Sequence, residues 1–261
     1  MLWESLREEF FENLGEEFLG EFLQRKAPWE VLKELKEYLY SILSPLPRLV
    51  PVETPLPKPL FITTEGMVIP YEEIIKVGTN YYFRGEEIKG ALIMAGAFIS
   101  GRKIYLGEKV IVEPFAYIEE PCYFSEGTKI RHSAYIRGSV YTGKGAVIGH
   151  TTEVKNSLFL RGAKAAHFAY VGDSILGAEV NLGAGTKLAN LKFHGKEISI
   201  EIKGNKINTG LRKMGAILGD RVQTGCNSVL QPGTLIGKDS VVYPGVSAPS
   251  GYYPPRKKIK S

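Results

Sequence analysis

The sequence has little cysteine and no long apolar segment. Its 261 residues include two cysteines, Cys122 and Cys226, which lie far apart and belong to no CxxC or Cys/His pattern. This spacing argues against a disulfide framework and indicates free thiols in a reducing compartment. No apolar run approaches the length of a membrane span, and the Glu-rich start lacks the cationic and apolar regions of a signal peptide. We therefore expect a cytoplasmic protein without a membrane partner.

A nucleic-acid-binding motif is missing as well, although the net charge is +5. Residues 1–44 contain ten Glu against five Lys and Arg, a balance of −5, which leaves +10 for the rest of the chain. Because basic and aromatic residues are not interleaved, nucleic acid is not the expected partner. The basic remainder instead favours small anionic ligands such as phosphorylated sugars or coenzyme A.

What the sequence does have is a six-residue repeat, in which every sixth residue is one that a protein interior accepts. The first run is Met94, Ser100, Leu106, Val112, Ile118, Phe124, Ile130, Ile136, Thr142, Ile148, Val154, Leu160 and Ala166. The next step is one residue short, at Val171, and the period then continues through Leu176, Leu182 and Leu188 and returns from Leu218 to Val242.

Each hexad has the features of a short strand followed by a corner. A smaller or β-branched residue precedes each large one by two positions, as Ala116 precedes Ile118, so that both face inward. Glycine often follows the large residue, where the backbone must bend. A single hexad cannot bury its apolar face, so the hexads must stack into a solenoid. The sequence therefore predicts a mainly β fold.

The remaining segments differ in character from the repeat. Apolar residues at helical spacing and a break at Pro28 predict a small N-terminal α-helical hairpin. We expect it to cover the open end or the flank of the solenoid, while a partner-binding or oligomerisation role stays open. The predicted segments are the hairpin at 1–44, a Pro-rich linker at 45–59, an irregular β lead-in at 60–93, the hexad solenoid at 94–250 with a basic inserted loop at 189–217, and a solvated basic tail at 251–261.

Residues 18 apart lie in one column of a three-hexad coil, about 4.8 Å from each other. Arg137 and Lys155 have this spacing. Two stacked cations repel unless an anion lies near them, and Arg and Lys both bind phosphate well. The pair predicts a phosphate site, with a solvated charged edge as the alternative.

His167 follows an inward position, in the column that the repeat assigns to Arg131, Gly149 and Ala184. A histidine near its ordinary pKa can accept a proton at neutral pH, so His167 is a candidate general base. His132 and His150 are also 18 apart, but no third ligand is evident, and we predict no metal site.

Several motifs resemble one group of hexapeptide-repeat acyltransferases. They are IRGSV at 136–140, TEVKNS at 152–157, KAAHFAYVGDSILG at 164–177, EVNLGAGT at 179–186, ANLKF at 189–193 and TGLRKMGAILGD at 209–220. The stretch from Cys122 to Gly245 is similar to the C-terminal acetyltransferase half of bacterial bifunctional uridylyltransferase/glucosamine-1-phosphate acetyltransferases. It resembles still more the matching domain of archaeal sugar-1-phosphate nucleotidylyltransferases. The resemblance implies a left-handed parallel β-helix and a homotrimer.

The resemblance also implies roles for individual residues. The catalytic base falls on His167. The substrate-binding residues fall on Arg137 and Lys155 (phosphate), Glu153 (near the amino group), Tyr170, Asn181, Asn190 and the loop residue Lys196. The groove for the co-substrate acetyl-CoA falls on Ala184, Cys226 and Pro244.

The sequence also departs from the bacterial pattern. Leu191, Lys192 and Phe193 replace a Tyr-Asp-Gly run after Asn190, and Cys226 and Pro244 replace small residues. Residues 1–93 contain no G-x-G-T nucleotide-binding loop, so we predict no nucleotidyl transfer.

The implied activity is N-acetylation of an amino-sugar 1-phosphate, glucosamine-1-phosphate or galactosamine-1-phosphate, in nucleotide-sugar precursor synthesis. Another hexapeptide O-acetyl- or acyltransferase and a non-catalytic sugar-phosphate-binding scaffold remain as alternatives.

Overall fold

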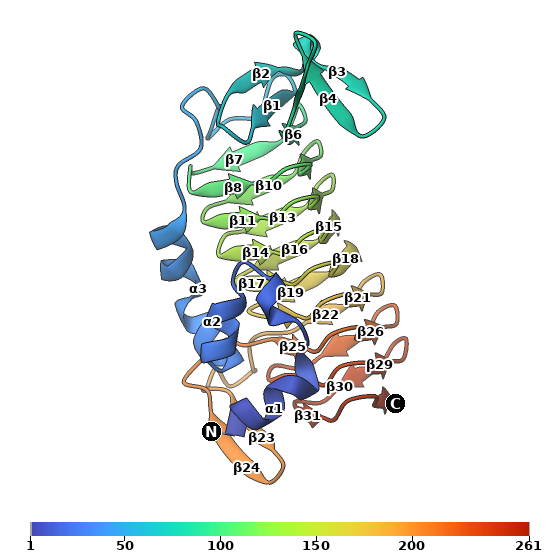
Figure 1. Ribbon diagram of the computed structural model, residues 1–261. Coiled ribbons are helices and arrows are strands. Elements are labelled where there is room, and N and C mark those ends of the chain that lie inside the picture. Colours follow the sequence, from blue (N-terminus) through green and yellow to red (C-terminus); the bar gives the residue numbers. More distant parts are fainter. Residues whose placement is uncertain (1, 261) are drawn as a thin grey trace.

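The computed structural model describes residues 2–260 and consists mainly of a parallel β-helix with a helical arm along one flank (Figure 1). Successive strands enter three sheets in turn. The first sheet contains β6 (Gly90–Ile93), β9 (Ile111–Val112), β12 (Lys129–Ile130), β15 (Val147–His150), β18 (Lys164–His167), β21 (Asn181–Leu182), β26 (Gln223–Thr224), β29 (Val241–Val242) and β32 (Lys258–Ile259). The second contains β7 (Phe98–Ser100), β10 (Tyr117–Glu119), β13 (Tyr135–Arg137), β16 (Glu153–Lys155), β19 (Tyr170–Gly172), β22 (Lys187–Leu188), β27 (Val229–Leu230) and β30 (Ser247–Ala248). The third contains β8 (Ile104–Leu106), β11 (Cys122–Phe124), β14 (Val140–Thr142), β17 (Ser157–Phe159), β20 (Ile175–Leu176), β25 (Ala216–Leu218), β28 (Thr234–Ile236) and β31 (Gly251–Tyr253).

Stacked apolar side chains fill the interior of the β-helix. On the second sheet Ile118, Ile136 and Val154 are fully buried and lie in register on adjacent coils. This stacking removes the apolar face of each hexad from water, at about 25 cal/mol per Å² of apolar surface. The predicted fold class, a mainly β hexad solenoid with a small helical N-terminal region, is confirmed.

The hexad register differs from the prediction at one step. The short step lies between Val154 and Phe159, because Thr142 pairs with Phe159 and not with Leu160. Phe159 and Ala165 face the core, whereas Leu160 packs against the helical arm outside. The coils between this point and the inserted loop are one residue shorter, as the pairing of Val154 with Val171 shows, and the 18-residue spacing returns after the loop, where Gln223 pairs with Val241.

The β-helix extends beyond both predicted boundaries. It begins at β6, and β31 and β32 form a last coil from the segment predicted to be a solvated tail. Ile259 is buried in the core because it continues the stack of Val242. The segment is therefore a coil and not a tail, although its basic side chains (Arg256, Lys257, Lys258 and Lys260) are exposed.

Residues 45–89 close one end of the β-helix (Figure 1). The Pro-rich segment has no helix or strand, but Leu46, Val50 and Leu56 are buried in the core of the first coils. The end is completed by antiparallel β1 (Leu60–Thr63) and β2 (Val68–Pro70), the 3₁₀ turn η2 (Tyr71–Glu73), and the small sheet of β3 (Ile75–Val77), β4 (Asn80–Phe83) and β5 (Glu86–Ile88).

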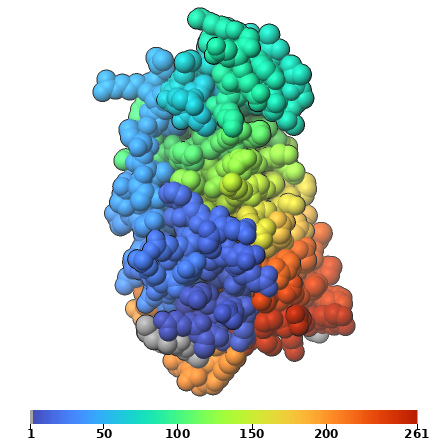
Figure 2. All heavy atoms as spheres, viewed as in Figure 1, coloured from blue at the N-terminus to red at the C-terminus, as the bar shows by residue number. Residues whose placement is uncertain are grey.

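The helical arm lies along one flank of the molecule (Figure 2) and packs on the outer face of the third sheet. It comprises α1 (Leu2–Phe10), η1 (Leu14–Glu16), α2 (Gly20–Arg25) and α3 (Pro28–Ile42). Phe10, Leu35 and Leu39 pack with outward-facing Leu158 and Ile175 of that sheet. The arm therefore covers the flank of the β-helix rather than its open end.

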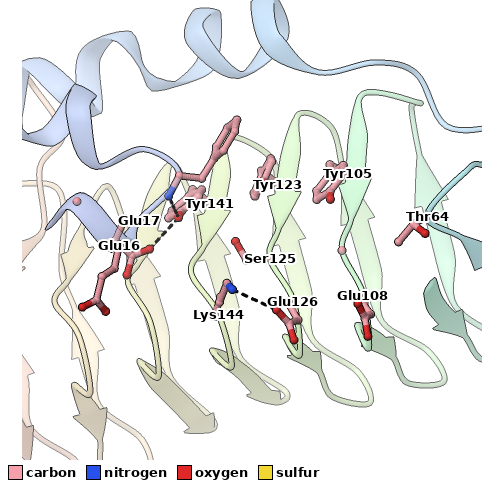
Figure 3. Close-up of a pocket in the computed structure, with 13 residues that line it drawn as sticks. Glu16, Glu17, Thr64, Tyr105, Glu108, Tyr123, Ser125, Glu126, Tyr141 and Lys144 are labelled. Carbon is pink, nitrogen blue, oxygen red and sulfur yellow. Dashed lines mark hydrogen bonds and ion pairs between the residues drawn. The ribbon is translucent and has the colours of Figure 1, made fainter. Parts of the chain in front are cut away.

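The first expected helix is broken in the middle of the arm. Between η1 and α2 the Glu17 carboxylate accepts hydrogen bonds from the Tyr141 hydroxyl (2.8 Å) and the Arg161 backbone amide (2.6 Å), as Figure 3 shows for Tyr141. Burial raises the pKa of Glu17. The helix is interrupted so that this side chain reaches the third sheet.

The inserted loop forms an antiparallel hairpin of β23 (Ser199–Ile202) and β24 (Asn205–Asn208), which packs into the same apolar layer as the arm. Within residues 2–260, no helix has both the length and the apolar character required to cross a membrane.

Candidate active site

Arg137 and Lys155 lie where second-sheet strands end and the chain turns toward the third sheet. Arg137 ends β13 and Lys155 ends β16, and the preceding residues Ile136 and Val154 are paired. Both side chains line one pocket of about 440 Å³. We call this edge of the β-helix the phosphate corner, after the ligand that the sequence predicts for it. The two cations, which are 18 residues apart in the sequence, thus lie at one place on adjacent coils.

Each of these cations has a carboxylate partner. Arg137 Nη1 lies 2.8 Å from Glu153 Oε1, and Lys155 Nζ lies 3.5 Å from Asp173 Oδ2. The hydrogen bond to Glu153 raises the pKa of Arg137. The repulsion between the stacked cations is therefore relieved by carboxylates of the chain itself, and the phosphate site stays a prediction. The Arg137 side chain is 41% exposed and remains accessible to a ligand.

Tyr170 and Asn190 meet above Gly172 at the same corner. A Cβ atom on Gly172 would lie 2.7 Å from both the Tyr170 hydroxyl oxygen and Asn190 Nδ2, so only glycine permits this approach. Asn190 Nδ2 donates to Asp173 Oδ2 at 2.5 Å. Burial, followed by the nearby Glu153 and Asp173 carboxylates, raises the pKa of Tyr170.

Asp173 is a site residue that the sequence analysis did not single out. Its carboxylate accepts hydrogen bonds from Asn156 and Asn190 and pairs with Lys155. Asp173 is buried and lies within the motif of residues 164–177. That position is the feature of the sequence by which it could have been identified.

His167 lies at a different edge, where first-sheet strands end and the chain turns toward the second sheet. It ends β18 and is exposed, and its register partner is His150. The predicted neighbour Gly149 was wrong, because the short step precedes His167. The His150 ring stacks on His132 with 4.1 Å between centroids.

The predicted acetyl-CoA residues continue the His167 column on the next coils. Backbone hydrogen bonds link each coil to the next along this column. The Gly185 amide donates to the His167 carbonyl at 3.0 Å. One coil further the Asn227 amide donates to the Ala184 carbonyl at 2.8 Å, and after that the Gly245 amide donates to the Cys226 carbonyl at 2.9 Å. The same register brings Pro244 beside Cys226. His167, Ala184, Cys226 and Pro244 therefore form one column, the histidine edge.

Two predicted residues join neither group. Asn181 is exposed on the first sheet, in register with Lys164. Lys196 is exposed on the inserted loop, where its backbone amide donates to His194 Nδ1. Among residues 2–260, no group of three or more potential metal-ligating His, Cys, Asp and Glu side chains occurs.

Another pocket, of about 530 Å³, lies between the helical arm and the third sheet (Figure 3). Tyr105, Tyr123 and Tyr141 form a ladder along it, and Lys144 pairs with Glu126 at 3.2 Å. Phe18 of the arm stacks on Tyr123 with 4.5 Å between ring centroids. None of the predicted site residues lines this pocket, which belongs to the attachment of the arm.

Comparison with known proteins identifies relatives of the central β-helix. Residues 118–209 match the family model of the GMPPB C-terminal domain. A bifunctional sugar-1-phosphate nucleotidylyltransferase/acetyltransferase of Sulfurisphaera tokodaii is 47% identical over 98 residues, which is 38% of this chain and 24% of the relative. The bifunctional protein GlmU of Methanococcus vannielii is 40% identical over 95 residues, 36% of this chain and 23% of the relative. The matched segment thus spans about a quarter of each relative.

The solved structure of a Francisella novicida UDP-N-acetylglucosamine acyltransferase covers 59% of this chain, and the match covers 57% of that protein, with a TM-score of 0.41 and 13% identity. The sequence matches confirm the resemblance predicted for the β-helix, which is similar to the C-terminal domain of these bifunctional proteins.

Proposed function

We propose that this protein transfers an acetyl group from acetyl-CoA to the amine of an amino-sugar 1-phosphate. The observation that carries the proposal is the convergence of Arg137, Lys155, Tyr170 and Asn190 at the phosphate corner. These residues lie within the segment that is similar to sugar-1-phosphate enzymes with an acetyltransferase function.

The phosphate corner offers groups that suit a sugar phosphate. The planar Arg137 guanidinium can donate two parallel hydrogen bonds to phosphate oxygens, while Lys155 adds a compact positive charge. Glu153 is suited to the substrate's amino group, and the Tyr170 hydroxyl and Asn190 amide can bind sugar hydroxyls. In this proposal Asn181 and Lys196 contact the substrate from the first sheet and the inserted loop.

In the proposed reaction, His167 accepts a proton from the amine as its nitrogen attacks the thioester carbonyl carbon. The new C–N bond gives a tetrahedral oxyanion, and a backbone amide near Ala184 is the candidate donor to it. When the C–S bond breaks, the coenzyme A thiolate leaves and takes the proton from the His167 imidazolium. The products are the N-acetyl sugar phosphate and coenzyme A, and the imidazole is regenerated.

The histidine edge is compatible with acetyl-CoA as the acetyl donor. The column from Ala184 to Pro244 presents short side chains on three successive coils, and Cys226 is exposed. An extended thioester arm could follow this strip and bring its carbonyl carbon to His167. The proposed reaction is acetyl transfer alone, without nucleotidyl transfer.

The test is thiol release from acetyl-CoA with glucosamine-1-phosphate or galactosamine-1-phosphate as acceptor. His167→Ala should lower the rate by roughly 10² to 10⁴, the usual contribution of a general base. His132→Ala is the matched control, because His132 occupies the same column two coils away and should retain wild-type activity. Equal rates for wild type and His167→Ala would refute the proposed base.

The acceptor dependence separates the alternatives. Thiol release that is indifferent to the sugar 1-phosphate and to Arg137→Ala would indicate another acyltransferase. Binding of the sugar phosphate without any turnover would indicate a non-catalytic sensor.

A further inference from the structure

Helix α3 passes beside the phosphate corner and faces its pocket. Lys33 and Lys36 of α3 line the same 440 Å³ pocket as Arg137 and Lys155. Residues three apart lie on one face of a helix, so both lysines point toward the pocket from the arm. The arm therefore supplies part of the pocket wall.

Contacts along its length hold α3 at this edge. Asn156 donates from Nδ2 to the Leu32 carbonyl at 3.1 Å, and the same amide donates to Asp173. The Tyr40 hydroxyl donates to Glu120 at 3.3 Å, and Lys103 Nζ donates to the carbonyl of Leu43, just after the helix, at 2.6 Å. The position of the two lysines over the pocket is thus fixed by the fold.

The carboxylates of the pocket have partners other than these lysines. Glu119 accepts from the Tyr135 hydroxyl at 2.9 Å, and Glu120 accepts from the backbone amides of Arg102 and Lys103 at 2.6 and 2.7 Å. Asp173 is held by Lys155, Asn156 and Asn190. Within residues 2–260, Lys33 and Lys36 form no ion pair, and the nearest aromatic partner is the Tyr40 ring, 6.0 Å from Lys36 Nζ.

An adjoining pocket of about 600 Å³ extends the positive surface. It shares Lys33, Asn156 and Asp173 with the first pocket and is also lined by Arg212 and Lys213 of the inserted loop. The loop leaves the β-helix at the phosphate corner, directly after β22. Cations from the arm, the second sheet and the loop therefore gather around one edge.

We infer that Lys33 and Lys36 bind the phosphate of the substrate together with Arg137 and Lys155, so that the helical arm is part of the binding site. The ligand class is an organic phosphate monoester, and the inference rests on the proposed function for the identity of its sugar. Unpaired ammonium groups beside an accessible guanidinium attract a phosphate dianion, and they have no internal carboxylate to release first.

The test is isothermal titration with glucosamine-1-phosphate and with inorganic phosphate at low salt. Lys33→Ala/Lys36→Ala should weaken both affinities roughly five- to twentyfold, because the variant loses two partly exposed ion pairs with the phosphate and their effects on the affinity multiply. The loss should shrink at high salt, because screening acts most strongly on exposed charges. In steady state, KM for the sugar phosphate should rise, while KM for acetyl-CoA and kcat should stay close to wild type.

Lys76→Ala/Lys206→Ala is the matched control, because it removes the same charge from exposed positions outside these pockets. Lys33→Arg/Lys36→Arg should retain most of the affinity and tests whether charge or helix stability is responsible. If the alanine pair binds phosphate as the control does while Arg137→Ala binds weakly, the inference is overturned and the proposed function stands. If no variant acetylates any acceptor but the alanine pair still loses phosphate affinity, the proposed function fails and the binding role of α3 remains.

Discussion

At the level of single residues, the carboxylate partners of Arg137 and Lys155 determine how the site can accept an anion. Glu153 and Asp173 lie at 2.8 and 3.5 Å from the two cations, so an incoming phosphate must share or displace these contacts. The Arg137 pair is partly exposed, and such pairs contribute only about 0.2–1 kcal/mol. A phosphate dianion can therefore replace Glu153 at Arg137 at little cost.

Glu153→Gln should consequently separate binding from turnover. Removing the competing charge should tighten phosphate binding about two- to fivefold, as expected for an exposed pair, whereas kcat should fall because the amine loses its carboxylate partner. The measurements are titration with inorganic phosphate and steady-state kinetics. Glu126→Gln, which breaks the pair with Lys144 on the third sheet, should change neither. Weaker phosphate binding in Glu153→Gln would contradict the exchange of partners.

Gly172→Ala tests the convergence of Tyr170 and Asn190. The new methyl group would lie 2.7 Å from both polar atoms and must push them apart. We expect KM for the sugar phosphate to rise about tenfold or more, since overpacking of this kind typically costs 1–3 kcal/mol. Gly15→Ala is the control, because nothing lies within 4 Å of its added Cβ. An unchanged KM in Gly172→Ala would show that these two groups do not bind substrate.

At the level of elements, the six-residue period was enough to predict the solenoid and the column that joins Arg137 to Lys155. It misplaced one step because Phe159 and Leu160 are both apolar, one for the core and one for the arm. When a sheet is buried on both faces, both of two adjacent residues can be apolar, and periodicity alone cannot tell which of them faces the core. The break in the first helix has a similar origin, since Glu17 is drawn to the third sheet by tertiary hydrogen bonds.

The same reasoning explains which site residues the sequence could reveal. Arg137 and Lys155 share a column, so a fixed repeat brings them together. Asp173 acts through a hydrogen-bond network, and Lys33 and Lys36 reach the pocket only because α3 crosses its edge. Contacts between an arm and a solenoid leave no period in the sequence, so no spacing argument could have found them.

The attachment of the arm to the last coils predicts a pH dependence of stability. Hydrogen bonds from Arg221 and then Lys238 lower the pKa of Glu12 to about 2, below its ordinary value of 4.5. A depressed carboxylate pKa stabilises the fold above the unfolded pKa, and this contribution is lost as the pH falls from about 5 toward 2. Because these groups are exposed, the contribution is at most about 1 kcal/mol.

Glu12→Gln should therefore be less stable than wild type at pH 7, and the difference should narrow below about pH 5 and close near pH 2. Urea unfolding across this pH range measures the effect. Added salt should reduce the loss in Glu12→Gln, because its partners are charged, but not in Glu65→Gln, where hydrogen bonds led by that from Thr64 lower the pKa of the carboxyl. A constant difference between wild type and Glu12→Gln at every pH would contradict the ion-pair explanation.

At the level of the whole molecule, the phosphate corner and the histidine edge lie on opposite sides of the second sheet. Within one β-helix, the strand β19 runs between the two edges: it follows the turn after His167, and it ends just before Asp173. A sugar phosphate would more easily bridge the two in a groove between neighbouring copies, with Lys155 from one and His167 from the next. We therefore propose a homotrimer with three shared sites, the closed cyclic arrangement that such a head-to-tail contact allows.

Mixing two inactive variants tests this arrangement directly. Sedimentation should give a mass of three times 28.9 kDa, about 87 kDa. His167→Ala and Lys155→Ala should each have little activity alone, but co-expressed in equal amounts they should form some sites that combine both wild-type residues. Random assembly gives about one quarter of such sites and hence about a quarter of wild-type activity. If both residues of a site come from one subunit, the mixture should remain as inactive as its components, and a fully active monomer would exclude the shared groove altogether.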